Sequence, residues 1–479
     1  MDASALFSSR PNKEGRMTPV SLSELVFLLF ESDNNPLHVS CLMVLEPPKD
    51  AAEFAGELLE AALKATPVAE PFDLVIDESQ FGLPQWRRCE HVDLAQHVRI
   101  AKLPTPGDRQ QLRELAGRIH SARLERDRPL WEMWILYGLE SQEIGLLVKF
   151  HHALADGKGV ASMLEQSFRL SDSRKRFIPF WQLGQSIGHR DSSIISLSKL
   201  TSPRFWYQQL DLSVGASKLF AKACASRLHL LKSPIKLPFS APRTPFNSYQ
   251  GSRAKKISLA TLPKARIRKL SMLTGVGELE LMLTLCDMAL HQYLQQHNWQ
   301  DRDPLVAMVP LYHPQSGERM HMISVGLVEL GRPAASPMQR LKKISQTYGK
   351  LRTQSSDEQV MEYNRYSALV NIVSLLAARY DSQQILPPAA NMLMSQVDAG
   401  TEPLSLMGAK LKQTFPLSLL LPGQTLNMTL LDYHEQVHIG LVCCRQSLPG
   451  FDSFALYLPE CLEQLEKSAY DSLLSAIAG

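Results

Sequence analysis

The sequence predicts a mixed α/β (α+β) fold in two domains, and three observations lead to this prediction. The chain has 479 residues, which is longer than one ordinary domain. Short apolar runs of strand length alternate with longer segments in which apolar residues recur at helical spacing. Residues 171–245 are rich in Ser, Pro and basic side chains and carry weak strand signal, so we expect them to connect the domains.

The predicted elements follow the apolar spacing along the chain. In the first helix, Ser21 is an N-cap candidate, and Leu22, Leu25, Val26 and Leu29 lie on one face. Further helices are expected at 50–66, 109–124, 263–274, 279–297, 339–351, 358–380 and 453–478. Strands are expected at 37–45, 133–137, 144–150, 252–259, 305–311 and 323–330, with several more between 391 and 445.

Composition excludes several classes of protein. The net charge is only +3, which argues against general nucleic-acid binding. Seven cysteines occur without a CxxC pair, and an odd count indicates reduced thiols rather than a disulfide framework. No apolar run is long enough to span a bilayer, and residues 1–16 are polar, without the core of a signal peptide. We therefore expect a cytoplasmic protein whose residues 1–16 form a disordered extension.

The stretch IGLLVKFHHALADGKG, residues 144–159, carries the clearest chemical signal. An apolar strand ends at His151 and His152, and Asp156 and Gly157 form a turn before the next helix. An imidazole at a strand end is held rigidly and can exchange a proton near neutral pH. Asp156 can orient His152 through an Arg or backbone amides, and Gly157 relieves the turn of steric constraint. The alternative is a pair of ordinary histidines beside a turn-forming Asp-Gly.

Several blocks of sequence resemble one family. HHALADG matches the HHxxxDG motif of the CoA-dependent acyltransferase superfamily. DRPLWEMWILYGL at 127–139, PLHVSCLMVLEPP at 36–48, TPFN at 244–247, LVAMVP at 305–310 and LNMTLLDYHEQVHIGLV at 426–442 narrow the match. Together they resemble the bacterial wax ester synthase/diacylglycerol acyltransferases, in the same order from about Met17 to the end of the chain.

This resemblance implies a fold and an activity. The fold would be two structurally similar mixed-sheet domains, 17–170 and 246–479, with the active site in a tunnel between them. The activity would be transfer of a fatty acyl group from acyl-CoA to a long-chain fatty alcohol or to diacylglycerol. Acyl-CoA would be a substrate, and no cofactor is expected. No metal site is expected either, because the two histidines are adjacent and no third ligand is placed by spacing.

The resemblance also assigns roles to residues. His152 would be the general base, with His151 and Asp156 beside it in the catalytic motif. Ser395 lies in SQVDAG, which is related to the TSQV of carnitine acyltransferases, so it is the expected oxyanion donor; the alternative is a strand-end hydroxyl bonded to backbone. His38 has the alternative of a hydrogen-bonded strand histidine. The residues expected to bind substrate are Gly157, His38, Asn427, Thr429 and Trp131.

Two departures from the family leave other functions open. Leu279 and Glu280 stand where the family has an Asn-Asp pair, and SQVDAG replaces the usual SNVPGP. A catalytically weakened lipid-binding homologue is therefore one alternative. A CoA-dependent acyltransferase that acts on another lipid or a polyketide hydroxyl is the other. The sequence leaves the acyl-chain length, the preferred acceptor and the oligomeric state open.

Apolar substrates predict contact with lipid. We expect peripheral association with the inner membrane or with lipid inclusions, since both substrates and the product are apolar. Residues 214–232 form a basic amphipathic pattern that can lie in a lipid interface. The alternative is an ordinary helix packed on the protein.

Overall fold

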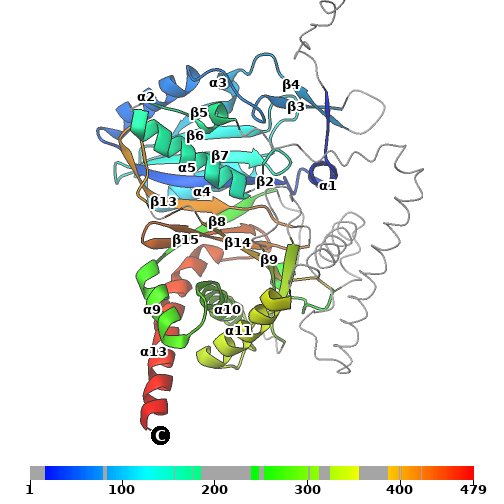
Figure 1. Ribbon diagram of the computed structural model, residues 1–479, viewed down its shortest axis with the longest axis vertical. Helices are drawn as coiled ribbons and strands as arrows, with labels where there is room; N and C mark the ends of the chain where they lie inside the picture. The colour runs from blue at the N-terminus through cyan, green and yellow to red at the C-terminus, as the bar shows by residue number, and fades with distance from the viewer. Residues whose placement is uncertain are drawn as a thin grey trace, which may run out of the picture.

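The computed structural model describes most of the chain, and its two sheets lie in the middle of the molecule (Figure 1). The described residues are 17–78, 84–155, 157–174, 176–184, 239–247, 253–299, 303–311, 324–354, 387–398, 400, 402–421 and 423–478. The segments expected to be helical at 214–232 and 358–380 lie outside this described part, as does the extension 1–16.

The N-terminal sheet has six strands in the order β12-β13-β2-β7-β6-β5. Their bounds are β2 (His38–Glu46), β5 (Val98–Lys102), β6 (Trp131–Tyr137), β7 (Ile144–His151), β12 (Ser405–Leu406) and β13 (Ala409–Leu417). Only β5 and β6 pair in parallel, so the sheet is mixed. A smaller sheet beside it has the order β1 (Thr18–Pro19), β4 (Gln85–Arg88) and β3 (Leu74–Asp77).

The C-terminal sheet also has six strands, in the order β10-β9-β11-β14-β15-β8. Their bounds are β8 (Lys255–Pro263), β9 (Val306–Leu311), β10 (Ser324–Glu329), β11 (Met392–Asp398), β14 (Leu426–Tyr433) and β15 (Gln436–Cys444). β11 runs parallel to both of its neighbours, while the other pairs are antiparallel. The expected pair of mixed-sheet units is therefore confirmed.

Most helices lie on the sides of the two sheets that face away from each other (Figure 1). Those of the N-terminal half are α1 (Leu22–Phe30), α2 (Ala51–Leu63), α3 (Leu94–His97), α4 (Arg109–Ser121), α5 (Gly157–Arg174) and α6 (Phe180–Leu183). Those of the C-terminal half are α9 (Lys264–Thr274), α10 (Glu278–Gln296), α11 (Pro337–Gln354) and α13 (Phe454–Ala478). Short 3₁₀ turns lie at Pro245–Asn247 and Phe451–Ser453. In the described part of the chain, no helix is long and apolar enough to cross a bilayer.

Local signals explain where the first helix begins and which side it buries. Ser21 caps α1 as expected, and Glu24 completes a capping box by accepting a hydrogen bond from the Ser21 amide. The predicted apolar face was wrong in one respect: Leu29 is 56% exposed, and Leu28 is buried instead. Leu25 and Leu28 therefore form the side of α1 that faces the core.

The C-terminal half of the chain contributes two strands to the N-terminal sheet. β12 and β13 come from the C-terminal half, yet β13 pairs along β2 in the N-terminal sheet. β13 then crosses β15. At the crossing, the backbone of Gly440 lies so close to the carbonyl of Pro416 that no side chain would fit, so a glycine is required. Apolar side chains of α4, such as Leu112 and Ile119, share one buried cluster with both sheets. The sheets therefore form one packed body, and the domain boundaries at 170 and 246 stay a prediction.

Candidate active site

The end of β7 is held by backbone hydrogen bonds on both sides. The amide of His151 donates to the carbonyl of Leu130 at 3.0 Å, and the amide of His152 donates to the carbonyl of Leu37 at 2.9 Å. His151 is also the register partner of His38 on β2. The expected order of strand, turn and helix is confirmed, since α5 begins at Gly157. Asp156 lies outside the described residues.

His152 lies at this strand end, half-buried, with one face of its ring covered. The imidazole stacks on the ring of Phe27 from α1, with 4.2 Å between centroids and 20° between planes. Its backbone and one ring face are therefore both fixed by other elements. A general base must lie within hydrogen-bond reach of a reactant, and of the two histidines only His152 is partly exposed.

His151, by contrast, is fully buried, and its protonation state follows from its contacts. The Nδ1 atom accepts a hydrogen bond from the amide of Ala153 at 3.1 Å, so the ring proton lies on Nε2. Nε2 faces Oε1 of Glu31 at 3.6 Å. Burial lowers the pKa of His151 to about 3, with further contributions from His152, Arg126 and Arg123. His151 is therefore neutral near pH 7.

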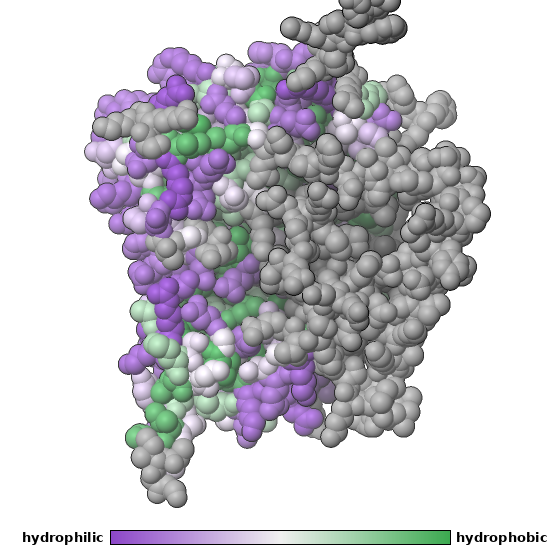
Figure 2. Space-filling view, in the orientation of Figure 1, coloured by the Kyte–Doolittle hydropathy of each residue, from purple (hydrophilic) through white to green (hydrophobic). Residues whose placement is uncertain are grey.

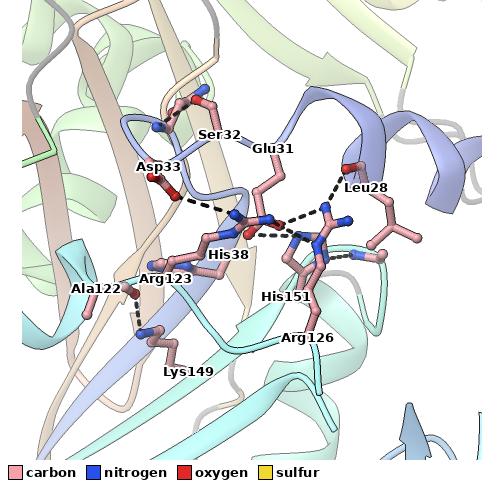
Figure 3. Close-up of polar contacts among 12 residues, drawn as sticks. Leu28, Glu31, Ser32, Asp33, His38, Ala122, Arg123, Arg126, Lys149 and His151 are labelled. Carbon is pink, nitrogen blue, oxygen red and sulfur yellow. Dashed lines mark hydrogen bonds and ion pairs between the residues drawn. The ribbon is translucent and has the colours of Figure 1, made fainter. Parts of the chain in front are cut away.

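An ion cluster around the buried carboxylate of Glu31 lies beside His151 (Figure 3). The side chain of Glu31, at the end of α1, is 1% exposed, and its Oε2 accepts from Nη2 of Arg123 at 2.8 Å and of Arg126 at 2.9 Å. Arg126 also donates to the carbonyl of Leu28 at 2.5 Å. Sequence reasoning missed these three charged residues. The available signal was a run of arginines directly before the PLW block, but nothing in the sequence pairs it with Glu31.

His38 belongs to a second buried polar cluster, beneath the same strand end. Its Nε2 donates to the carbonyl of His120 at 2.5 Å, and His120 Nδ1 is bonded to Ser40 Oγ at 2.8 Å. Burial is the main cause that lowers the pKa of His38 well below its usual value and that of His120 to about 3. This environment matches the alternative of a hydrogen-bonded strand histidine. The substrate-binding role of His38 stays a prediction.

Lys149 completes that cluster and caps a helix from inside the protein. Its Nζ donates to the carbonyls of Ile119 at 3.1 Å and Ala122 at 2.5 Å, at the C-terminus of α4. A cation there satisfies carbonyls that the helix leaves unpaired and complements the helix dipole. Burial lowers the pKa of Lys149 to about 8. The end of α4 is thus tied to β7 directly before the chain reaches Arg123.

Ser395, Thr429 and Asn427, which the sequence analysis named as site residues, lie together in the C-terminal sheet. Asn427 Nδ2 donates to the carbonyl of Leu419 at 3.0 Å, so its Oδ1 accepts from Thr429 Oγ1, also at 3.0 Å. Thr429 uses its only hydroxyl proton in the bond to Asn427. The Ser395 hydroxyl must therefore be the donor in its 3.0 Å bond to Thr429 Oγ1. The parallel register of β11 and β14 places Ser395 opposite Thr429. Ser395 thus bonds a side chain, where the alternative was a backbone partner.

An apolar cluster connects this polar row to the histidines. The side chain of Leu419 packs with Leu37 and Val39, and Phe27 and Phe30 pack against the same cluster. Leu37 is the residue whose carbonyl accepts from the amide of His152. Asn427, from the C-terminal half, therefore fixes Leu419, and Leu419 packs on Leu37, the residue that binds the His152 amide.

Trp131 lies in the core of the N-terminal half. Its side chain is completely buried, its Nε1 donates to the carbonyl of Phe72 at 2.9 Å, and its ring stacks on His97 and Trp181. The PLW block therefore packs the sheet against α6. The predicted contact between Trp131 and substrate stays a prediction, and the buried position of the side chain does not support it.

The replaced family pair lies at the start of α10. Leu279 packs partly buried against the C-terminal core, and Glu280 is buried with its carboxylate folded back over Gly277. An acidic side chain in the first turn complements the positive end of the helix. Within the described part of the chain, neither an arginine partner of Glu280 nor a group of three potential metal ligands is present.

Comparisons with known proteins give one consistent result. Residues 20–278 match the wax ester synthase/diacylglycerol acyltransferase catalytic domain, and residues 321–466 match the C-terminal domain of the same proteins. A probable diacylglycerol O-acyltransferase of Mycobacterium tuberculosis is 30% identical over 478 residues, covering 95% of this chain and 96% of that protein. A putative diacylglycerol O-acyltransferase of the same organism is 29% identical, covering 94% of this chain and 99% of its own.

Solved structures agree. The wax ester synthase/diacylglycerol acyltransferase of Marinobacter aquaeolei VT8 is 26% identical, with a TM-score of 0.74, and the match covers 95% of this chain and 100% of that one. The first condensation domain of the calcium-dependent antibiotic synthetase shares the fold at 13% identity, with a TM-score of 0.58 over 95% and 97% of the two chains.

Proposed function

The chain belongs to the wax ester synthase/diacylglycerol acyltransferase family, and on that premise we propose how its residues carry out acyl transfer. The enzyme transfers an acyl group from acyl-CoA to the hydroxyl of a long-chain alcohol or of diacylglycerol. One observation carries the residue assignment: of the two adjacent histidines, His151 is completely buried and His152 is partly exposed.

His152 is the general base of this proposal. It removes the proton of the acceptor hydroxyl while that oxygen attacks the thioester carbonyl of acyl-CoA. The tetrahedral intermediate then collapses, the carbon–sulfur bond breaks, and the CoA thiolate takes the proton from His152. No acyl-enzyme is required, because both substrates are held together and proximity lowers the barrier. We place the reactants in a tunnel between the two halves of the protein.

Ser395 is the proposed oxyanion donor. In the resting arrangement its proton points to Thr429, whose oxygen stays fixed by Asn427. Rotation about the Cβ–Oγ bond redirects the proton to the developing oxyanion without disturbing Thr429. A donor in this position typically contributes about 3 kcal/mol to transition-state stabilisation.

His151, Glu31 and the proposed partner Asp156 are positioning groups in this mechanism. The neutral ring of His151 and its ion cluster keep the strand end rigid, so that the following residue is held in place. Asp156 is proposed to orient the turn that carries His152. No step of the transfer uses these side chains as a proton donor or acceptor.

Substitution of the two histidines tests the base. His152→Ala should lower the rate of thiol release from palmitoyl-CoA with hexadecanol by about 10²–10⁴-fold, with little change in melting temperature. His151→Ala should instead lower the melting temperature, because it opens a cavity beside Glu31, and should reduce the rate less. The exposed His434→Ala serves as the matched control. A His152→Ala enzyme with the parent rate would show that another group removes the proton.

We further propose that the enzyme contacts lipid through the shared end of α9 and α13. Met272 is 79% exposed, and Tyr470, Leu473 and Leu474 are exposed on the last turns of α13. The two helices run side by side in the same direction, since Arg266 pairs with Glu466 and Lys269 lies over the Tyr470 ring. This register brings Met272 towards Leu473. Figure 2 shows the apolar surface at this end of α13.

Flotation with liposomes tests this surface. Changing Leu473 and Leu474 together to Ser should reduce the bound fraction on phosphatidylcholine vesicles, because these side chains supply the apolar contact. Leu456→Ser, an exposed site nearer the start of α13, is the matched control and should bind as the parent does. Equal binding by all three proteins would show that lipid is bound by another surface, and the basic segment 214–232 would be the next candidate.

A further inference from the structure

We propose that Phe27 is a positioning residue for the proposed base: its ring holds the His152 imidazole in the plane in which it accepts the hydroxyl proton. This inference rests on the assignment of His152 as the base. His151 and Asp156 are the neighbours that the sequence singled out, and both belong to the same motif as His152. Phe27 comes from a different element, at the start of the chain, and contacts the ring directly.

The geometry of the pair is a parallel stack. The centroids lie 4.2 Å apart and the planes differ by 20°, so the two rings are in face contact. The backbone of His152 is anchored independently through its amide to Leu37. With the backbone anchored and one ring face covered, rotation about the Cβ–Cγ bond is restricted. The stack therefore fixes the plane of the imidazole, and with it the directions of its two nitrogens.

Phe27 can act in this way because α1 is fixed at both ends. At its N-terminus, Ser21 and Glu24 form the capping box, and the indole of Trp86 donates to Glu24 at 3.2 Å. At its C-terminus, Arg126 donates to the carbonyl of Leu28 and to the carboxylate of Glu31. Phe27 lies in the last turn, between these two anchors. The buried ion cluster therefore has a second effect: it fixes the helix that carries the stacked ring.

The stack also affects how easily His152 takes up a proton. The face of a phenyl ring carries negative charge density and attracts a cation placed over it. The imidazolium form of His152, which arises in the transition state, lies over this face. Phe27 therefore stabilises the protonated base as well as its orientation. Loss of the ring should reduce both the rate and the basicity of His152.

Three variants test the proposal. Phe27→Leu keeps an apolar side chain but removes the ring, so kcat should fall about tenfold through misorientation, with KM for palmitoyl-CoA nearly unchanged. In Phe27→Leu, the acid limb of the pH–rate profile should shift to lower pH by about half a unit, because His152 becomes less basic. Phe27→Tyr restores a ring and should recover both values. Phe30→Leu, on the same helix and in the same apolar cluster, is the matched control and should keep the parent's acid limb.

The outcomes separate this inference from the assignment of the base. If Phe27→Leu and Phe30→Leu share the same kcat and the same acid limb, or if Phe27→Tyr fails to recover, the positioning role is refuted. An NMR titration of the His152 Cε1–H resonance, identified by its loss in His152→Ala, measures basicity without activity. If His152→Ala keeps the parent rate while this titration still shifts in Phe27→Leu, the base assignment fails and the stacking effect stands.

Discussion

Buried neutral histidines should make the folded protein sensitive to mild acid. Burial lowers the pKa of His120 and His151 to about 3 and that of His438 to about 4, below the usual value near 6.5. The unfolded chain binds protons at these positions as the pH falls below about 6.5, whereas the folded protein excludes them until about pH 4 to 3. Their contribution to stability is therefore complete above pH 6.5 and is lost progressively as the pH falls towards 3.

The size of this effect follows from the number of groups. Each such histidine lowers the free energy of unfolding by up to about 1.4 kcal/mol for every pH unit below 6. The three together give about 4 kcal/mol per unit, and His38, whose pKa is also well below its usual value, adds to this slope. Proteins of this kind have a total stability of about 5–15 kcal/mol. About 4 kcal/mol of this stability should therefore be lost between pH 6 and pH 5.

Urea denaturation followed by tryptophan fluorescence at pH 7.5, 6.5, 6.0 and 5.5 measures the slope. In the parent, Thr261 Oγ1 lies 3.1 Å from His438 Nδ1. His438→Gln removes one titrating group but supplies a side-chain amide that can bond the same hydroxyl. Between pH 6 and 5.5 its slope should be about 1.4 kcal/mol per unit shallower than that of the parent, and the two slopes should agree above pH 7. A parent protein equally stable at pH 7.5 and 5.5, or equal slopes at low pH, would refute the reasoning.

Three further predictions concern the polar row, the helix cap and the replaced pair. Ser395→Ala should lower kcat about 10²-fold if Ser395 donates to the oxyanion. Thr429→Val removes the resting partner of the Ser395 hydroxyl and should leave kcat within a few-fold of the parent. Equal losses in the two variants would show that the row of polar residues has only a structural role. Lys149→Met should lower the free energy of unfolding by about 2–3 kcal/mol in urea denaturation, because the carbonyls at the end of α4 lose their donor. The change of Leu279→Asn with Glu280→Asp should raise thiol release with diacylglycerol if the family's pair supports the site; an unchanged rate would show that the departure is neutral.

The sequence predicted most of the secondary structure because that information is local. Apolar spacing placed the strand that ends at His151 and the helix after it, and the side chain of Ser21 predicted where α1 begins. The motif blocks identified the family because they occur in a characteristic order. Ser395 and Thr429 were each named from the resemblance to the family, and the structure places their hydroxyls in contact.

Other features depended on contacts between residues far apart in the chain. Glu31 meets Arg123 across 92 positions, and β13 crosses to β2 from the other half of the protein. A periodic pattern shows which face of an element is apolar, but it contains no information about which other element will cover that face. For the same reason the exposed position of Leu29 on α1 was predicted wrongly.

By itself, the sequence determined the strand–turn–helix unit, the paired histidines and the family, because each depends on residue types at short spacing. Only the tertiary structure decided that His151 is buried and neutral while His152 is half-exposed and stacked on Phe27. Two adjacent identical side chains differ only through their surroundings. Those surroundings come from α1, from the end of α4 and from the opposite sheet, whose packing brings distant charges and rings to one strand end.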